Sequence, residues 1–250
     1  MRRRTLLTAV LALALTTTSL ALSPGAPGKP STIRCTPDDG AAAQPDVEET
    51  TVTSRADGVE IDITIFKPAC ATAETPVPVI LHSHGWSGTK SSDPADFSSE
   101  LAAGFGIVSI TQRGHGDSGG QARVQDPEFE AQDIKSVIDH VAALPWTAKD
   151  TDRAGNVIAD DPVLFAMGGS YGGGYQTITA LTEIRESGRT RFDALAPEIT
   201  WFDLPHSLAP NDVVRSEWNE VLYAAGTALV DMHPLIHQSF AWGAATGEWP

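Results

Sequence analysis

The sequence predicts an α/β protein in which helices cover both faces of a mostly parallel sheet. Between residues 77 and 202, short and continuously apolar runs alternate with helical segments, as expected for strands buried between two helical layers. A hairpin with alternating polarity precedes them. The chain has 250 residues, 41% of them hydrophobic, so it can bury one sizeable core. We therefore expect one main domain.

The expected elements follow in order along the chain. Residues 47–69 read as two alternating strands joined at Asp57-Gly58, a typical hairpin turn. Later strands are expected at 77–85, 105–114, 162–170 and 192–202, with helices at 95–103, 127–144 and 171–186. The best-marked helix has Asp126 as N-cap and Pro127 at its first position. Its apolar face is expected in the core and comprises Phe129, Ile134, Val137, Ile138, Val141 and Leu144.

The amino-terminal residues predict export. Three arginines at 2–4 precede an apolar run that ends in small residues, the layout of a secretory signal peptide. The general and twin-arginine pathways both remain open, because any basic start gives similar letters. A transmembrane anchor is the competing interpretation, but threonines 16–18 interrupt the run and a flexible "SPGAPGKP" follows. We expect residues 1–28 to be signal peptide and linker of a secreted, extracellular protein without a stable membrane anchor.

The charge balance excludes some partners. With 17 basic and 32 acidic residues the formal net charge is −15, and such a surface repels nucleic acid and anionic lipid. We therefore expect no nucleic-acid partner, and the sequence leaves the oligomeric state open.

The stretch "FAMGGSYGGGY", residues 165–175, places Ser170 between a strand and a helix. This G-x-S-x-G pattern in a strand-turn-helix context predicts a nucleophile elbow of the α/β-hydrolase fold. The strained turn needs small neighbours, which Gly168 and Gly172 supply. We interpret Ser170 as the catalytic nucleophile, with Gly168 and Gly172 as elbow glycines.

A second serine matches the same pattern. Ser118 lies in "GHGDSGG", letters that also surround the nucleophile of chymotrypsin-like proteases. That fold is all-β and has its base and acid upstream of the serine, whereas this chain alternates strands and helices. We therefore expect the glycines around Ser118 to shape a loop.

An oxyanion hole is expected beside Ser170. One donor is the backbone N–H of Tyr171, at the helix start, and the second is that of Trp86, with Ser87 as the near alternative. His82 and His84 precede the nucleophile, whereas the base of this fold follows it, so we do not assign either as the base.

Together these segments resemble a known family. "QRGHGDSGG" after a core strand, "PW" at 145–146 and the elbow "GGSYGGGYQ" are similar to the X-prolyl dipeptidyl peptidases and cocaine esterase-like acyl hydrolases. The likeness covers roughly residues 45–205. It implies a serine hydrolase that acts by acyl transfer on a peptide bond, releasing X-proline dipeptides, or on a small acyl ester. Two features depart from the family: the polar insertion at 147–161, and Trp86 where cocaine esterase-like enzymes use a tyrosine side chain at the oxyanion.

The base and acid of a triad are not evident after Ser170. Only His206, His233 and His237 follow it, and residues 205–250 read as helices with exposed tryptophans, the start of a helical cap. We expect residues 29–204 to be the amino-terminal part of the hydrolase core, with the sheet, acid and histidine completed downstream of residue 250. Two alternatives stay open: a short enzyme that pairs Asp203 or Asp231 with His233 or His237, and a noncatalytic hydrolase-like protein that binds a peptide or lipid.

Nothing in the sequence predicts a metal or cofactor. Asp150, Asp152 and Asn156 around Gly155 loosely resemble a calcium loop, but the bidentate glutamate and the full ligand count are missing. We expect a solvated acidic loop there.

The two cysteines, Cys35 and Cys70, predict a disulfide in an exported chain. Closing a loop of this size stabilises the fold by roughly 3 to 4 kcal/mol in the chain-entropy model. Intact mass of the secreted protein, measured without reductant, should be lower by two hydrogens than that of the reduced form. Two titratable thiols in protein from the culture medium would contradict the bridge.

Overall fold

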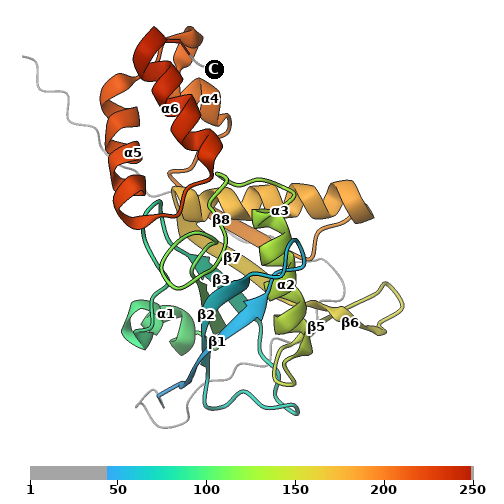
Figure 1. Ribbon diagram of the computed structural model, residues 1–250. Helices are drawn as coiled ribbons and strands as arrows, with labels where there is room; N and C mark the ends of the chain where they lie inside the picture. The colour runs from blue at the N-terminus through green and yellow to red at the C-terminus, as the bar shows by residue number, and fades with distance from the viewer. Residues whose placement is uncertain (1–43, 249–250) are drawn as a thin grey trace, which may run out of the picture. The chain divides into compact units, whose positions relative to one another are not determined.

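The computed structural model describes residues 44–248, and its centre is a six-stranded sheet (Figure 1). The strand order is β1-β2-β4-β3-β7-β8. The strands are β1 (Asp46–Thr53), β2 (Glu60–Lys67), β3 (Val79–Ser83), β4 (Gly106–Ile110), β7 (Leu164–Gly169) and β8 (Ala194–Glu198). β1 pairs with β2 and β2 with β4 in antiparallel fashion, whereas β4, β3, β7 and β8 run parallel. The predicted hairpin and parallel sheet are confirmed.

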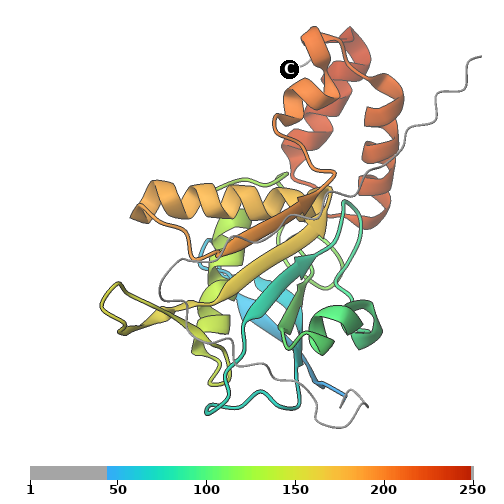
Figure 2. The ribbon, with the colours of Figure 1, turned by 180° about the vertical axis from the view of Figure 1, so that it is seen from behind.

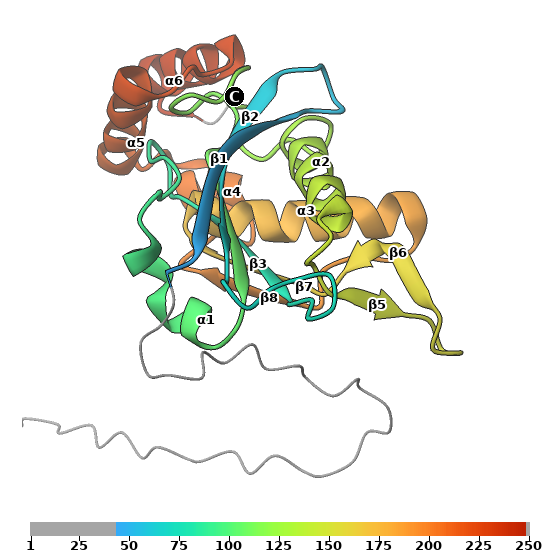
Figure 3. The same ribbon diagram turned by 90° about the horizontal axis from the view of Figure 1, so that it is seen from below.

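Side chains alternate between two apolar layers along the central strands. Leu81 on β3 and Val108 on β4 belong to the larger layer, while their neighbours Ile80 and Ile107 belong to the smaller one. The larger layer packs against α2 (Glu130–Ala143) and α3 (Tyr171–Ser187), and the smaller one against the 3-10 turn η1 (Pro94–Phe97) and α1 (Ser98–Ala102). Figure 3 shows these helices on opposite sides of the sheet. Helices on both faces are therefore confirmed.

α2 begins three residues later than the sequence predicts. Its first residue is Glu130, and the Asp126 carboxylate accepts the N–H of Glu128 (2.8 Å) inside a preceding turn. Most of the predicted apolar face is correct, because Ile134, Val137, Ile138 and Val141 are buried in the larger layer and Leu144 packs against it. Phe129 is the exception: it precedes the helix, and its ring packs against the guanidinium groups of Arg113 and Arg123.

The insertion at 147–161 is a second sheet, not the expected acidic loop. β5 (Lys149–Thr151) and β6 (Val157–Pro162) form an antiparallel hairpin beside the amino end of β7 (Figure 2). The Asp152 carboxylate accepts the backbone N–H groups of Ala154 and Asn156, so it closes the hairpin turn. Within residues 44–248 no cluster of three or more His, Cys, Asp or Glu side chains is arranged to hold a metal ion.

Helices follow β8. They are α4 (Leu204–Leu208), the 3-10 turn η2 (Pro210–Asp212), α5 (Ser216–Leu229) and α6 (Pro234–Thr246). Trp218 and Trp242 are exposed on α5 and α6, as predicted. None of the helices in the described part of the chain is both long and apolar enough to cross a bilayer. The expected signal segment and Cys35 lie outside the described residues, so the signal peptide and the bridge to Cys70 stay predictions.

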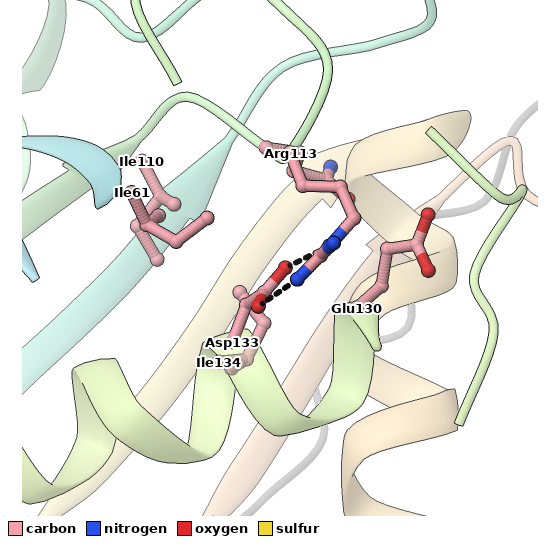
Figure 4. A pocket seen from close by; sticks show the side chains of 7 residues that line it. Ile61, Ile110, Arg113, Glu130, Asp133 and Ile134 are labelled. Carbon is pink, nitrogen blue, oxygen red and sulfur yellow. Dashed lines mark hydrogen bonds and ion pairs between the residues drawn. The ribbon is translucent and has the colours of Figure 1, made fainter. Parts of the chain in front are cut away.

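A buried arginine joins three parts of the core. Arg113, in the loop after β4, is 1% exposed and donates from Nε and Nη2 to both carboxylate oxygens of Asp133 on α2 (2.8 Å each). Figure 4 shows this pair in a small pocket beside Glu130. Arg113 also binds Asp57 in the β1–β2 turn (2.8 and 3.0 Å). The guanidinium therefore ties the hairpin and α2 to the loop that leads toward the site.

Loss of Arg113 should destabilise the fold strongly. Arg113→Met leaves the Asp133 carboxylate buried without its cation, which costs about 3 to 5 kcal/mol of unfolding free energy. Asp57→Asn removes a partner that is one-third exposed, and should cost about 1 kcal/mol or less. Urea unfolding of both variants measures the difference. Equal losses of unfolding free energy would show that the buried Arg113–Asp133 pair does not contribute more to stability than the Arg113–Asp57 pair.

Candidate active site

Ser170 lies at the sharp turn between β7 and α3. Its φ is 54° and its ψ −116°, a left-handed conformation that is rare for a residue with a side chain. Its N–H donates to Glu198 O (2.9 Å), and its carbonyl accepts from Gly173 N–H (2.9 Å) and Gly174 N–H (3.1 Å). Strain of this kind persists only where the surroundings fix it, and it is concentrated at functional sites.

The glycines around Ser170 leave no room for side chains. A Cβ on Gly172 would lie 2.3 Å from Ser83 O, and one on Gly168, whose φ is 147°, would lie 2.6 Å from the same oxygen. The start of α3 therefore touches the carboxyl end of β3 backbone to backbone. This is the close approach that the sequence pattern predicts at these two positions.

The start of α3 presents free donors. Tyr171 and Gly172 occupy the first turn, where N–H groups have no partner within the helix. In the described part of the chain, neither these N–H groups nor that of Trp86 donates to another protein atom. Unpaired N–H groups at a helix N-terminus favour negative charge nearby.

The loop after β3 lies beside the serine. A Cβ on Gly85 would be 3.8 Å from Ser170 Cβ, which places the residue before Trp86 against the Ser170 side chain. The Trp86 ring packs edge-on against Tyr171 (centroids 5.1 Å apart), and its Nε1–H donates to Leu222 O on α5 (2.9 Å). The two predicted oxyanion donors thus belong to residues whose side chains pack against each other. Ser87, the alternative donor, has φ 63° and donates its hydroxyl to Trp86 O.

A buried polar layer supports this loop. His84 uses both ring nitrogens: Nδ1–H donates to Gly85 O (2.7 Å), and Nε2 accepts from Gln112 N–H (3.0 Å). Burial lowers the pKa of His84 to about 4, so the ring is neutral at pH 7. Tyr171 is anchored by Gln125, whose amide donates to Tyr171 O (3.0 Å).

His82, which like His84 precedes Ser170 in the sequence, is also structural. The His82 ring hydrogen-bonds Ser109 (3.1 Å) and packs edge-on against Phe97 in the smaller apolar layer. Neither His82 nor His84 hydrogen-bonds Ser170, in agreement with the prediction that the base is elsewhere.

Ser118 shapes a loop, as the sequence predicts. Its hydroxyl donates to Thr111 O (2.7 Å) and accepts the N–H of Asp62 (2.9 Å), and the residue is buried. A hydroxyl held on both sides in this way fastens the loop after β4 to β2.

The histidines and carboxylates after Ser170 do not form a triad with it. His233 caps α6 by accepting Leu235 N–H (3.3 Å), and His237 hydrogen-bonds Tyr223 (2.8 Å). The Asp203 carboxylate caps α4, and that of Asp231 accepts from Gln121 (3.2 Å). Within residues 44–248 no side chain hydrogen-bonds the Ser170 hydroxyl, so the short-triad alternative has no geometric support.

The fold agrees with comparisons to known proteins. The sequence profile of the X-Pro dipeptidyl-peptidase (S15) family matches residues 57–238. The chain belongs to this family. No curated protein matches the sequence.

Solved structures similar to this S15-family chain include two crystal structures of a CocE/NonD family hydrolase from Staphylococcus aureus. The first is 20% identical with a TM-score of 0.53, covering 77% of this chain and 35% of that one. The second is 17% identical with a TM-score of 0.50, covering 78% and 39%. An acetyl xylan esterase from Paenibacillus sp. R4 is 17% identical over 84% of this chain and 60% of that one, with a TM-score of 0.47. The structural similarity to the S. aureus hydrolase shows that this chain has the α/β-hydrolase fold. The chain spans between a third and two fifths of the length of that hydrolase.

Sequence reasoning missed the residues that hold the elbow from the side of β8. Glu198 O and the Thr200 hydroxyl both bind the Ser170 backbone. The predicted strand 192–202 ends at Glu198, because Ile199 turns at φ 39°. No pattern in the letters marks such a turn, since isoleucine ordinarily favours strands.

His84 should make stability depend on pH. Its folded-state pKa of about 4 lies below the unfolded value of 6.5, so protonation favours unfolding. The contribution of His84 to the free energy of unfolding is complete above pH 6.5, and about 3 kcal/mol of it is lost as the pH falls to 4. Urea unfolding of the parent and of His84→Gln between pH 7 and 4.5 should give a smaller pH-dependent loss for the variant. His206→Gln, at an exposed position on α4, is the matched control and should follow the parent. Parallel curves for His84→Gln and the parent would contradict this assignment.

Proposed function

We propose that this hydrolase acts by acyl transfer, with Ser170 as the nucleophile. The observation that carries the proposal is Ser170 at a strained strand-turn-helix corner, beside unpaired N–H groups. Membership of the S15 family supports it. Glycines 168 and 172 allow the turn to lie against β3.

In the proposed reaction Ser170 Oγ attacks an ester or amide carbonyl. Its proton passes to a general base, and a covalent acyl-enzyme forms as the leaving group departs. The N–H groups of Tyr171 and Trp86 stabilise the negative charge that develops on the carbonyl oxygen. Water then hydrolyses the acyl-enzyme and regenerates the serine.

The base and acid are proposed to lie outside this 250-residue sequence. Supporting this, the rings of His84, His233 and His237 already have hydrogen-bond partners away from Ser170. A histidine with a pKa near 4 is also poorly matched to proton transfer at neutral pH. Residues 205–250 are proposed as the start of a helical cap.

The proposed substrate is either a peptide with proline at its second position or a small acyl ester. The family's description favours the first, and no described residue selects between them. We further propose that the protein is secreted, carries the Cys35–Cys70 bridge, and has neither a nucleic-acid partner nor a stable membrane anchor, as its signal-like start and net charge of −15 suggest.

Substitution of Ser170 should abolish hydrolysis. In the natural protein that contains this chain, Ser170→Ala should lower turnover of p-nitrophenyl acetate by about 10⁴ to 10⁶. Ser118→Ala is the matched control, because its hydroxyl only fastens a loop, and it should keep most of the activity. A fluorophosphonate probe should label the parent at Ser170.

The same assay tests where the base comes from. The 250-residue chain alone should hydrolyse the ester barely above background, while a natural form that includes the proposed base and acid should be active. Robust turnover by the 250-residue chain, abolished by His233→Ala or His237→Ala, would establish a self-contained triad instead. Absence of probe labelling in every natural form would favour a noncatalytic binding protein.

A further inference from the structure

The Ser170 backbone is held by the segment that leaves β8. The N–H of Ser170 donates to Glu198 O (2.9 Å), and the Thr200 hydroxyl donates to Ser170 O (2.9 Å). Both polar groups of the nucleophile's main chain are thereby bound by residues two positions apart. No other side chain in the described part of the chain hydrogen-bonds the Ser170 backbone.

This segment packs tightly on the first turn of α3. A Cβ on Gly173 would lie 2.7 Å from Thr200 Cβ, and one on Gly174 would lie 3.0 Å from the Trp201 ring. The Trp201 ring also faces that of Tyr171, with centroids 6.3 Å apart. Glycines at 173 and 174 therefore let residues 200 and 201 lie directly on the helix start.

Backbone strain accompanies this contact. Ile199, between the two binding residues, has φ 39° and is 91% exposed, so its own side chain gains little from the conformation. A β-branched residue at positive φ has an energetic cost, because its Cβ crowds the backbone. Contacts on either side of Ile199 must offset that cost, and the two hydrogen bonds to Ser170 are such contacts.

We infer that Thr200 is a positioning residue for the nucleophile. This inference rests on the proposed function of Ser170. The left-handed Ser170 peptide has alternative conformations of lower strain, and its carbonyl must keep its direction for Oγ to face the substrate. The Thr200 hydroxyl fixes that carbonyl from the β8 side, while the N–H groups of Gly173 and Gly174 fix it from the helix.

The test compares three threonine variants in the natural protein form that hydrolyses p-nitrophenyl acetate. Thr200→Val keeps the shape and removes the hydroxyl, whereas Thr200→Ser keeps the hydroxyl. Thr179→Val is the matched control, because Thr179 is buried on α3, the helix that Thr200 contacts, and its hydroxyl has no partner among the described residues. Unfolding midpoints and the stoichiometry of fluorophosphonate labelling give the fraction of folded, reactive protein.

Thr200→Val should lower kcat about tenfold to a hundredfold with KM changed less than twofold, since small misplacement of a reacting group costs this much. Thr200→Ser should keep at least half of kcat, and Thr179→Val should match the parent. Amide hydrogen exchange at Gly173 and Gly174 should accelerate in Thr200→Val only, because these groups share the Ser170 carbonyl.

The outcomes separate this inference from the proposed function. If Ser170→Ala inactivates the enzyme but Thr200→Val and Thr179→Val have the same kcat, the positioning role is wrong while the nucleophile stands. If Thr200→Ser loses as much kcat as Thr200→Val, the hydroxyl is not what matters and the role is again wrong. If Ser170→Ala stays active, the proposed function fails, and the positioning role fails with it.

Discussion

The contact between the start of α3 and the end of β3 constrains the site more than any other. Gly172 lies so close to Ser83 O that a Cβ would come within 2.3 Å of it, and Gly168 faces the same oxygen. Because the helix can approach the sheet this closely, the loop after β3 passes beside Ser170, at the corner where the first N–H groups of α3 lie. A bulkier residue at either position would separate helix and strand, and with them the serine and the predicted oxyanion donors.

The apolar pattern was enough to predict the sheet, because burial between two helical layers demands continuous hydrophobic strands. Val79 to Leu81 and the pair Ile107 and Val108 show this: successive side chains enter opposite apolar layers, and all of the predicted central strands form. The elbow was predictable for a related reason. At positions 168 and 172 the backbone is too close to Ser83 O for any residue with a Cβ. The two glycines in the sequence therefore indicate this close approach directly.

The contacts that sequence reasoning missed join residues far apart in the chain. Arg113 binds Asp57 and Asp133, and the sequence around each of these three residues gives no sign of which residue it pairs with. Thr200 reaches Ser170 only because Ile199 adopts a conformation that isoleucine rarely takes. The β5–β6 hairpin was missed because its strands are short and largely polar, and their burial does not alternate as it does in a strand with one buried face.

The polar layer beneath the site explains why the loops there keep their form without a regular sheet to hold them. Strands end at Ser83 and Ile110, so the backbone groups beyond them need other partners, and His84 supplies one by accepting the N–H of Gln112. The arrangement has a cost: His115 Nε2 and Gln125 Oε1 are buried without a hydrogen-bond partner among the described residues. A ring that must stay neutral to hold the backbone cannot also exchange protons with a substrate near neutral pH, since its acceptor nitrogen is occupied. His84 therefore serves the scaffold, and the proposed function needs a different group to accept the Ser170 proton.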